Sequence, residues 1–95
     1  DAVFCTSDIK AVGAQKAMRE KGMKIPLISF DNLSISEYIG LSTVSQPMYQ
    51  MGFDATQMLI TRISKKDSEP QHTQHVPELV IRSSSEKKTV KHKAV

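Results

Sequence analysis

The feature that most constrains this chain is a short apolar run, residues 27–30 (LISF), followed directly by Asp31 and Asn32. A continuous run of this length is typical of a strand buried on both faces, as in a parallel sheet. Asp and Asn favour turns because their side chains bond nearby backbone groups. Ligands of open α/β sheets bind beyond the carboxyl ends of the strands, so Asp31 is a candidate ligand-binding carboxylate. The alternative is that Asp31 and Asn32 only terminate the strand.

Strand and helix patterns alternate along the rest of the chain. Apolar or β-branched runs predict strands at residues 2–6, 25–30, 41–45 and 78–82. Helical spacing predicts helices at residues 9–21 and from Pro47 to about residue 63, with one helical turn at residues 35–38. Ser7 or Asp8 is expected to cap the first helix, and Gly22 to end it in a left-handed conformation. This order predicts an α/β fold with a mainly parallel sheet.

Each predicted helix has one apolar face that is expected to be buried. The members of these faces recur at helical spacing: Ile9, Val12, Gly13 and Ala17, with Ala14 and Met18 alongside, in the first helix, and Met48, Met51, Gly52, Ala55, Met58, Leu59, Arg62 and Ile63 in the second. Two full helices cannot cover both faces of a parallel sheet, so the chain is expected to be part of a layered domain. It begins at Asp1, which indicates a processed product or a fragment.

Composition excludes several classes of protein. No apolar run approaches the ~20 residues that span a bilayer, and no signal peptide opens the chain. Cys5 is the single cysteine, which rules out an internal disulfide and suits a reducing, cytoplasmic compartment. A net charge of +3 does not indicate nucleic-acid binding by itself. The serine- and lysine-rich end, residues 83–93, predicts a disordered tail.

Nothing in the sequence indicates an enzyme, a metal site or a cofactor. His72, His75 and His92 lie in polar stretches without the four convergent ligands of a structural zinc site. Cys5 lies in an apolar run, where a small buried side chain is a better interpretation than a nucleophile. The four glycines are dispersed, so no phosphate-binding loop is formed.

Four blocks of this sequence together resemble one family. Residues 1–14 (DAVFCTSDIKAVGA) are similar to the block A-[IV]-x-x-x-N-D-x-x-A-x-G-A of the lactose-repressor (LacI/GalR) family of bacterial transcription regulators. Residues 28–32 (ISFDN) resemble its [IV]-[GS]-[FY]-D-[DN] block. Residues 41–47 (LSTVSQP), with Met51 and Gly52, resemble its L-T-T-[VI]-x-Q-P-x-x-x-[ML]-G block. Residues 77–85 (PELVIRSSS) resemble its ending, P-x-L-[VI]-x-R-x-S.

The resemblance implies a fold and a role. Residues 1–85 would be a segment of the C-terminal lobe of a three-layer, type I periplasmic-binding-protein-like domain, and residues 86–95 a disordered tail. A small effector, often a sugar or nucleobase derivative, would bind between two lobes and shift a homodimer between DNA-binding states. Operator DNA would be bound only through an N-terminal domain that this chain does not contain. The alternative is a sugar-binding protein of a transport system, which shares the lobe.

The resemblance also implies site residues. Asp31 matches the aspartate that accepts hydrogen bonds from effector hydroxyls, since a carboxylate offers two acceptor oxygens. Gln46 matches a glutamine near the cleft, with a plain helix cap as its alternative. Ser7 replaces the family asparagine next to Asp8, and Asp8 is expected to cap the helix. Positions that pack the dimer interface correspond to Val12, Tyr38 and Leu41, any of which could instead belong to the core.

Two positions depart from the family pattern. About four residues that usually separate the proline from the strand are missing between Pro26 and Leu27. Gly40 stands where two prolines are common. The first change shortens the entry to the central strand, and the expectation is an altered register there.

Overall fold

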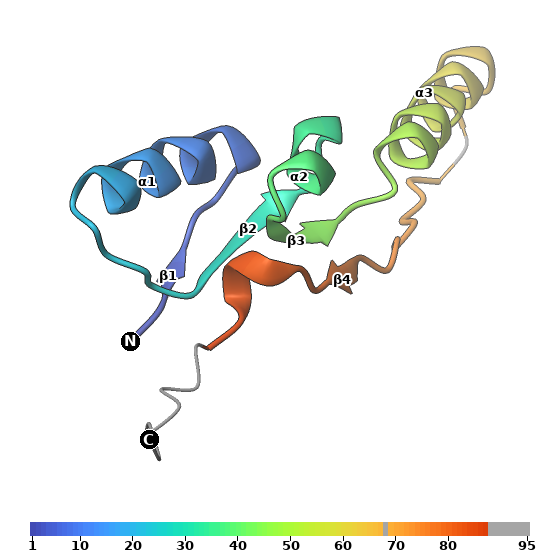
Figure 1. Cartoon of the computed structure of the whole chain (residues 1–95). Coiled ribbons are helices and arrows are strands. Elements are labelled where there is room, and N and C mark those ends of the chain that lie inside the picture. The colour runs from blue at the N-terminus through green and yellow to red at the C-terminus, as the bar shows by residue number, and fades with distance from the viewer. Residues whose placement is uncertain (68, 88–95) are drawn as a thin grey trace. The chain divides into compact units, whose positions relative to one another are not determined.

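The structure is a computed structural model that describes residues 1–67 and 69–87 (Figure 1). The chain forms two compact units: unit 1 comprises residues 1–45 with the segment from Leu79 onward, and unit 2 comprises residues 46–78. The elements in chain order are β1 (Val3–Phe4), α1 (Asp8–Glu20), β2 (Leu27–Asp31), α2 (Ser34–Tyr38), β3 (Ser42–Ser45), α3 (Met48–Ser64), β4 (Glu78–Val80) and the 3-10 helix η1 (Ser83–Ser85).

The sheet has the strand order β1-β2-β3-β4, and its assigned registers are parallel. Val3 pairs with Leu27 across β1 and β2, and Asp31 pairs with Ser45 across β2 and β3. The Val3 amide donates a 2.9 Å hydrogen bond to the Pro26 carbonyl. Pairing with β1 therefore begins at Pro26 itself, so the shortened entry still leads directly into a registered strand. The predicted α/β fold with a mainly parallel sheet is confirmed.

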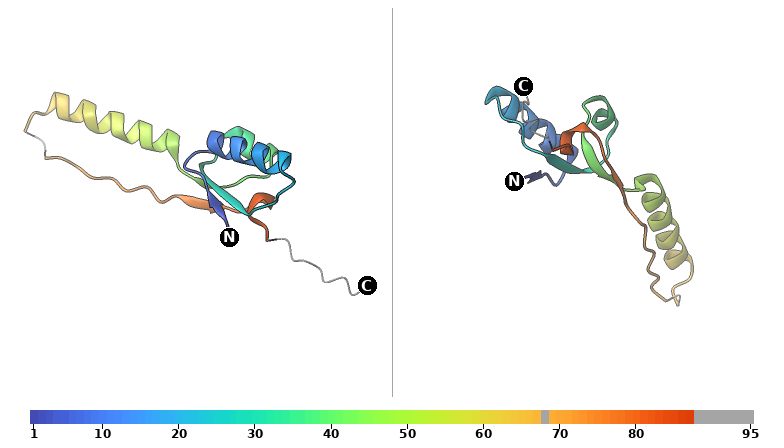
Figure 2. Two further views of the ribbon diagram at one scale, coloured as in Figure 1. Left: turned by 90° about the vertical axis from the view of Figure 1, so that its left-hand side faces the viewer. Right: turned by 60° about the horizontal axis from the view of Figure 1, so that its bottom comes forward.

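Helices α1 and α2 lie on the same side of the sheet (Figures 1 and 2). The fully buried apolar residues of the described chain are Ala11, Leu27 and Leu41, and half-buried neighbours pack around them: Val3, Cys5, Ala14, Met18 and Ile39. Side chains alternate along a strand, so Leu27 and Ser29 face the helices while Ile28 and Phe30 are half-buried on the opposite face. None of the helices in the described residues is long and apolar enough to cross a membrane.

The predicted inward face of α1 is wrong at Ile9 and Val12, whereas Ala14 and Met18 are half-buried against the core as predicted. Ile9 is 65% exposed and Val12 is 39% exposed, whereas Ala11 is buried. The cause lies in Asp8, whose carboxylate is buried and hydrogen-bonded inside unit 1. A fixed inward position for Asp8 turns residues three and ten positions later, Ala11 and Met18, toward the sheet as well. Gly22, with φ of 63°, follows the helix in the predicted left-handed conformation.

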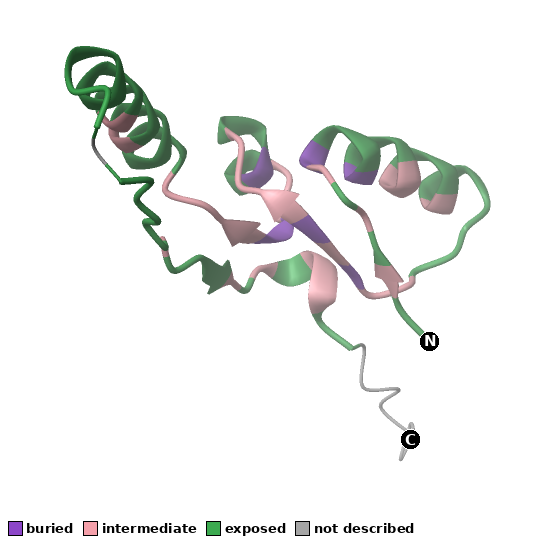
Figure 3. Cartoon of the chain, turned by 180° about the vertical axis from the view of Figure 1, so that it is seen from behind, coloured by how far each residue is buried: buried purple, intermediate pink, exposed green. Residues whose placement is uncertain are grey.

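Unit 2 contains α3 and the extended segment that follows it. The predicted buried face of α3 is wrong for this chain, because none of its 17 residues is buried (Figure 3). The exposed residues include Met48, Phe53, Leu59 and Ile63. The described part of unit 2 supplies no second layer that could cover an apolar helical face.

The disordered tail that composition predicts for residues 83–93 starts too early, whereas the resemblance places its start after residue 85. Residues Ser83–Ser85 form η1, and Ser84 bonds to three different segments of unit 1. Its amide donates to the Gly40 carbonyl (2.9 Å), its hydroxyl donates to the Leu27 carbonyl (2.8 Å), and the same oxygen accepts from the Ser42 amide (2.7 Å). Glu86 and Lys87 are exposed, and residues 88–95 lie outside the described part of the chain.

Candidate functional site

The carboxyl end of β2 carries two consecutive residues with positive φ. Asp31 has φ of 124° and Asn32 has φ of 61°, and both side chains are half-buried. Residues other than glycine rarely adopt positive φ, and such conformations persist only where the surroundings hold them. The turn Asp31–Asn32 is therefore a position that other contacts must fix.

Asn32 provides several of those contacts. Its amide donates to Thr43 Oγ1 (3.2 Å), and its side-chain Nδ2 donates to Ser45 Oγ (3.2 Å). Its Oδ1 accepts a 3.1 Å hydrogen bond from Nη1 of Arg82, which also donates to the Leu41 carbonyl (2.8 Å). The turn is thus tied to β3 and to the segment between β4 and η1.

Arg82 was not predicted as part of the site. In the sequence, Arg82 lies only within the predicted strand at residues 78–82 and within the family block at residues 77–85. Its partner Asn32 lies 50 positions earlier, so no local pattern could indicate the pairing. A lone arginine at the end of a short apolar strand was the available signal.

Asp8 is the most densely hydrogen-bonded side chain of unit 1, with an exposed fraction of 0%. Its Oδ1 accepts from the hydroxyls of Ser29 (2.6 Å) and Thr43 (2.8 Å). Its Oδ2 accepts from the Leu33 amide (2.7 Å) and from the hydroxyl of Ser36. One carboxylate therefore connects the start of α1 to β2, β3 and α2.

The pKa of Asp8 lies below the ordinary value for an aspartate. Burial on its own would raise the pKa, because desolvation disfavours the charged form. Hydrogen bonds from Ser29, Ser36, the Leu33 amide and Thr43 act in the opposite direction and outweigh burial. Asp8 is accordingly a carboxylate at neutral pH, with its charge stabilised by donors rather than by a cation.

In the structure, the residue that caps α1 is Ser7 and not Asp8. Ser7 has an extended backbone, and its hydroxyl accepts a 3.3 Å hydrogen bond from the Lys10 amide. Asp8 is the first residue of the helix, and its carboxylate points into unit 1, so the expectation that it caps the helix is wrong. Ser7 follows β1 and Asp31 ends β2, and parallel neighbours place both at the same edge of the sheet.

The remaining predicted residues lie apart from that edge or in the other unit. Gln46 belongs to unit 2, where its carbonyl accepts from the Met48 amide (2.8 Å) and Pro47 takes the cap position. Val12 and Tyr38 are exposed, Tyr38 by 84%. Leu41 is fully buried in the core, so its side chain presents no surface to a partner.

A groove of 490 Å³ in unit 1 has Val12 on its wall. Its apolar lining includes Met18, Met23 and Ile39, and its basic residues are Arg19 and Lys24. The groove is lined by residues of α1, β2 and η1 and of the loops next to them, and neither Asp31 nor Asn32 belongs to its lining. It adds apolar area to the exposed surface around Val12.

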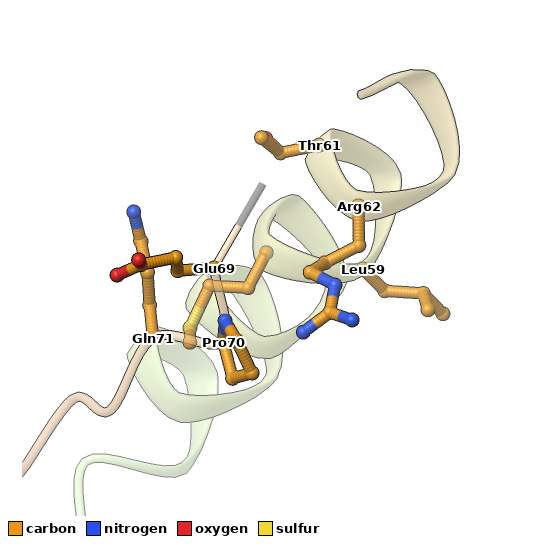
Figure 4. A pocket seen from close by; sticks show the side chains of 7 residues that line it. Leu59, Thr61, Arg62, Glu69, Pro70 and Gln71 are labelled. Carbon is orange, nitrogen blue, oxygen red and sulfur yellow. The ribbon is translucent and has the colours of Figure 1, made fainter. Parts of the chain in front are cut away.

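Unit 2 has a small pocket of its own, with a volume of 180 Å³ (Figure 4). Side chains from α3 and from the segment after it line the pocket: Met58, Leu59, Thr61, Arg62, Glu69, Pro70 and Gln71. None of the predicted site residues belongs to this lining. Within residues 1–67 and 69–87, no three His, Cys, Asp or Glu side chains are grouped as metal ligands would be.

Known proteins match this chain over most of its length. A family model described as a periplasmic binding protein-like domain matches residues 1–85. The HTH-type transcriptional repressor PurR of Histophilus somni (strain 129Pt) is 40% identical over 89 residues, and that of Vibrio campbellii is 34% identical over 92 residues. These matches cover 87% and 90% of this chain, but only 27% and 28% of the repressors.

A solved structure shares the fold as well. The crystal structure of an uncharacterized protein from Actinobacillus succinogenes superposes with a TM-score of 0.76 at 34% identity. The match covers 90% of this chain and 33% of that protein. The chain thus spans about a quarter to a third of the proteins that it matches, and the curated relatives named above are transcriptional repressors. With the parallel sheet and all four sequence blocks inside the matched range, this chain belongs to the periplasmic binding protein-like domain family, in its LacI/GalR regulator type.

Proposed function

We propose that this chain is the effector-binding and dimerisation segment of a cytoplasmic LacI-type transcriptional regulator. A small sugar-like effector binds at the carboxyl edge of the sheet and changes the affinity of the full-length homodimer for operator DNA. DNA contact is made by another domain of the full-length protein. The observation that carries this proposal is the position of Asp31, in a fixed positive-φ turn at the end of a central parallel strand.

The chemistry of Asp31 suits the proposed ligand class. A carboxylate accepts hydrogen bonds from vicinal hydroxyls or from ring N–H groups, and the carboxyl ends of parallel strands are where such ligands bind. Ser7 at the same edge adds a hydroxyl that can donate or accept. The effector binds one state of the regulator more tightly than the other and shifts the population toward it, without a chemical step.

The 34–40% identity to transcriptional repressors supports a regulator over a sugar-binding protein of a transport system. The two alternatives differ in whether the full-length protein binds DNA. An HTH protein of this type binds a two-fold operator as a dimer, and a transport receptor does not bind DNA.

Ligand binding by the full-length protein tests the proposal. D-ribose, D-galactose, adenine and guanine serve as probes in a thermal-shift screen, and calorimetry then gives the affinity of the best binder. We expect Asp31→Ala to weaken binding by about 10- to 100-fold, because a charge-assisted hydrogen bond is lost. Asp67→Ala is the matched control, because Asp67 is an exposed carboxylate in unit 2.

Unchanged affinity in Asp31→Ala would remove Asp31 from the effector site. Operator binding is measured on the same samples by fluorescence anisotropy, with and without the best binder. A ligand that binds tightly while the protein has no DNA affinity in either state would favour the transport receptor.

A further inference from the structure

We propose that Asp8 is a positioning residue for effector binding: its buried carboxylate holds the Asp31–Asn32 turn in its ligand-binding conformation through Thr43 and the Leu33 amide. This inference rests on the proposed function of Asp31. Asp8 itself is fully buried and does not reach a ligand. Its effect is exerted through hydrogen bonds to the residues that surround the turn.

The first connection runs through the hydroxyl of Thr43. This hydroxyl donates to Asp8 Oδ1 (2.8 Å) and accepts from the Asn32 amide (3.2 Å). A hydroxyl can donate one hydrogen bond, and the carboxylate of Asp8, which can only accept, receives it. The oxygen lone pairs of Thr43 are then directed to the Asn32 amide, so the charge on Asp8 determines which way the hydroxyl points.

The second connection is direct. Oδ2 of Asp8 accepts from the Leu33 amide at 2.7 Å. The amides of Asn32 and Leu33 are consecutive, and each is bonded to Asp8 or to a group that Asp8 orients. Because both carboxylate oxygens are engaged, the plane of the carboxylate is fixed as well.

Because two successive residues have positive φ, the turn needs contacts that restrain it. Asp31 and Asn32 adopt backbone conformations that are unfavourable for residues with a side chain, and without restraint the turn would relax. Relaxation would change the backbone conformation of Asp31 at the end of β2 and with it the direction of its carboxylate. The buried network around Asp8 contains no unsatisfied side-chain donor or acceptor in the described residues, so it can maintain one conformation.

Ser29 offers a matched control within the same network. Its hydroxyl donates to the same oxygen, Asp8 Oδ1, at 2.6 Å, and the residue is as fully buried as Thr43. The hydrogen bonds of Thr43 reach the turn, whereas that of the Ser29 hydroxyl ends at Asp8. Thr43→Val and Ser29→Ala therefore each remove one buried donor from one oxygen, but only Thr43→Val also removes the acceptor of the Asn32 amide and with it the first of the two connections between Asp8 and the turn.

The test uses the full-length protein and the best binder among D-ribose, D-galactose, adenine and guanine. We expect Thr43→Val to weaken binding about tenfold and Ser29→Ala less than twofold, at comparable unfolding midpoints. In an Asp31→Ala background, Thr43→Val should have no further effect, because its action passes through Asp31. Equal losses in Thr43→Val and Ser29→Ala, or the same tenfold loss in both backgrounds, would overturn the inference.

Amide hydrogen exchange of the ligand-free protein provides a readout that needs no effector. The peptide spanning residues 28–36 should exchange faster in Thr43→Val than in Ser29→Ala, because the Asn32 amide has lost its acceptor. Equal exchange in the two variants would contradict the inference. Failure of the proposed function would appear as unchanged affinity in the single variant Asp31→Ala. Failure of the inference would appear as equal behaviour of Thr43→Val and Ser29→Ala, so the two failures are distinguishable.

Discussion

Nε2 of His75 lies 2.8 Å from Oδ2 of Asp54, and this contact joins the extended segment after α3 to the helix itself. The other carboxylate oxygen accepts a 2.8 Å hydrogen bond from the Gln50 side chain. The hydrogen bonds from His75 and Gln50 lower the pKa of Asp54 below its ordinary value. Within unit 2, this pair links two stretches that are 21 positions apart.

His75→Ala should release the extended segment from α3. The variant loses the contact to Asp54, and we expect faster amide hydrogen exchange in residues 69–77 while the exchange of α3 changes little. His72→Ala is the control, because His72 is exposed in the same segment. Equal exchange rates in the two variants would show that the His75–Asp54 contact does not restrain this segment.

The network around Asp8 predicts a dependence of stability on pH. Its folded-state pKa lies below the unfolded value of about 3.9, so its contribution to the free energy of unfolding is complete above about pH 4. That contribution is lost as the pH falls through the folded-state pKa, where the carboxyl takes up a proton. Urea unfolding of the full-length protein between pH 3 and pH 7 measures the effect.

Asp8→Asn should reduce this dependence. The amide cannot accept from all four donors, so we expect a loss of about 1–3 kcal/mol at pH 7 and a smaller change between pH 7 and pH 3. Asp67→Asn, at an exposed position, should follow the wild-type curve. If the free energy of unfolding of Asp8→Asn falls with pH as steeply as that of the wild type, another group causes the acid sensitivity.

Glycine is favoured at position 40 by the positive φ of the backbone there and by the adjacent side chain of Ser83. Its φ is 66°, and a Cβ at this position would collide with the Ser83 hydroxyl of η1. Proline is fixed near a φ of −65°, so the prolines common here in the family could not adopt this conformation. We expect Gly40→Ala to destabilise the protein by about 1–3 kcal/mol. The measurement is the thermal unfolding midpoint of the full-length protein.

Gly13→Ala is the control for that substitution, and its expected effect has the opposite sign. Gly13 lies within α1, and a Cβ there meets no atom within 4 Å. Alanine in a helix is favoured over glycine by about 0.5–1 kcal/mol. A higher midpoint for Gly13→Ala with an unchanged midpoint for Gly40→Ala would contradict the account of Gly40.

The proposed dimer face involves Val12 and Tyr38, the two exposed members of the predicted set. Val12→Glu or Tyr38→Glu should weaken dimerisation of the full-length protein, because each places a charge in an interface that excludes water. Sedimentation velocity over a range of concentrations measures the dissociation constant. Ile81→Glu, also at an exposed apolar position, is the control. Dissociation constants equal to that of the control would place the interface elsewhere.

The sequence predicted elements whose signals are local. The parallel order of strands followed from apolar runs separated by a helix or a helical turn, and Asp31 was placed at a strand end from the change in composition after Phe30. The role of Asp8 was not accessible, because its donors lie 21 to 35 positions away. The prediction that Ile9 and Val12 face the sheet was wrong for the same reason. Apolar periodicity cannot indicate that an aspartate takes an inward position.

The four donors that converge on Asp8 also set an order in which this network can change during evolution. Loss of one hydroxyl, at Ser29, Ser36 or Thr43, leaves the carboxylate with three donors. Loss of Asp8 first would leave three hydroxyls and one amide without their acceptor in a single step. This network is therefore expected to change first at single hydroxyls, because only replacement of Asp8 removes the acceptor from all four donors at once.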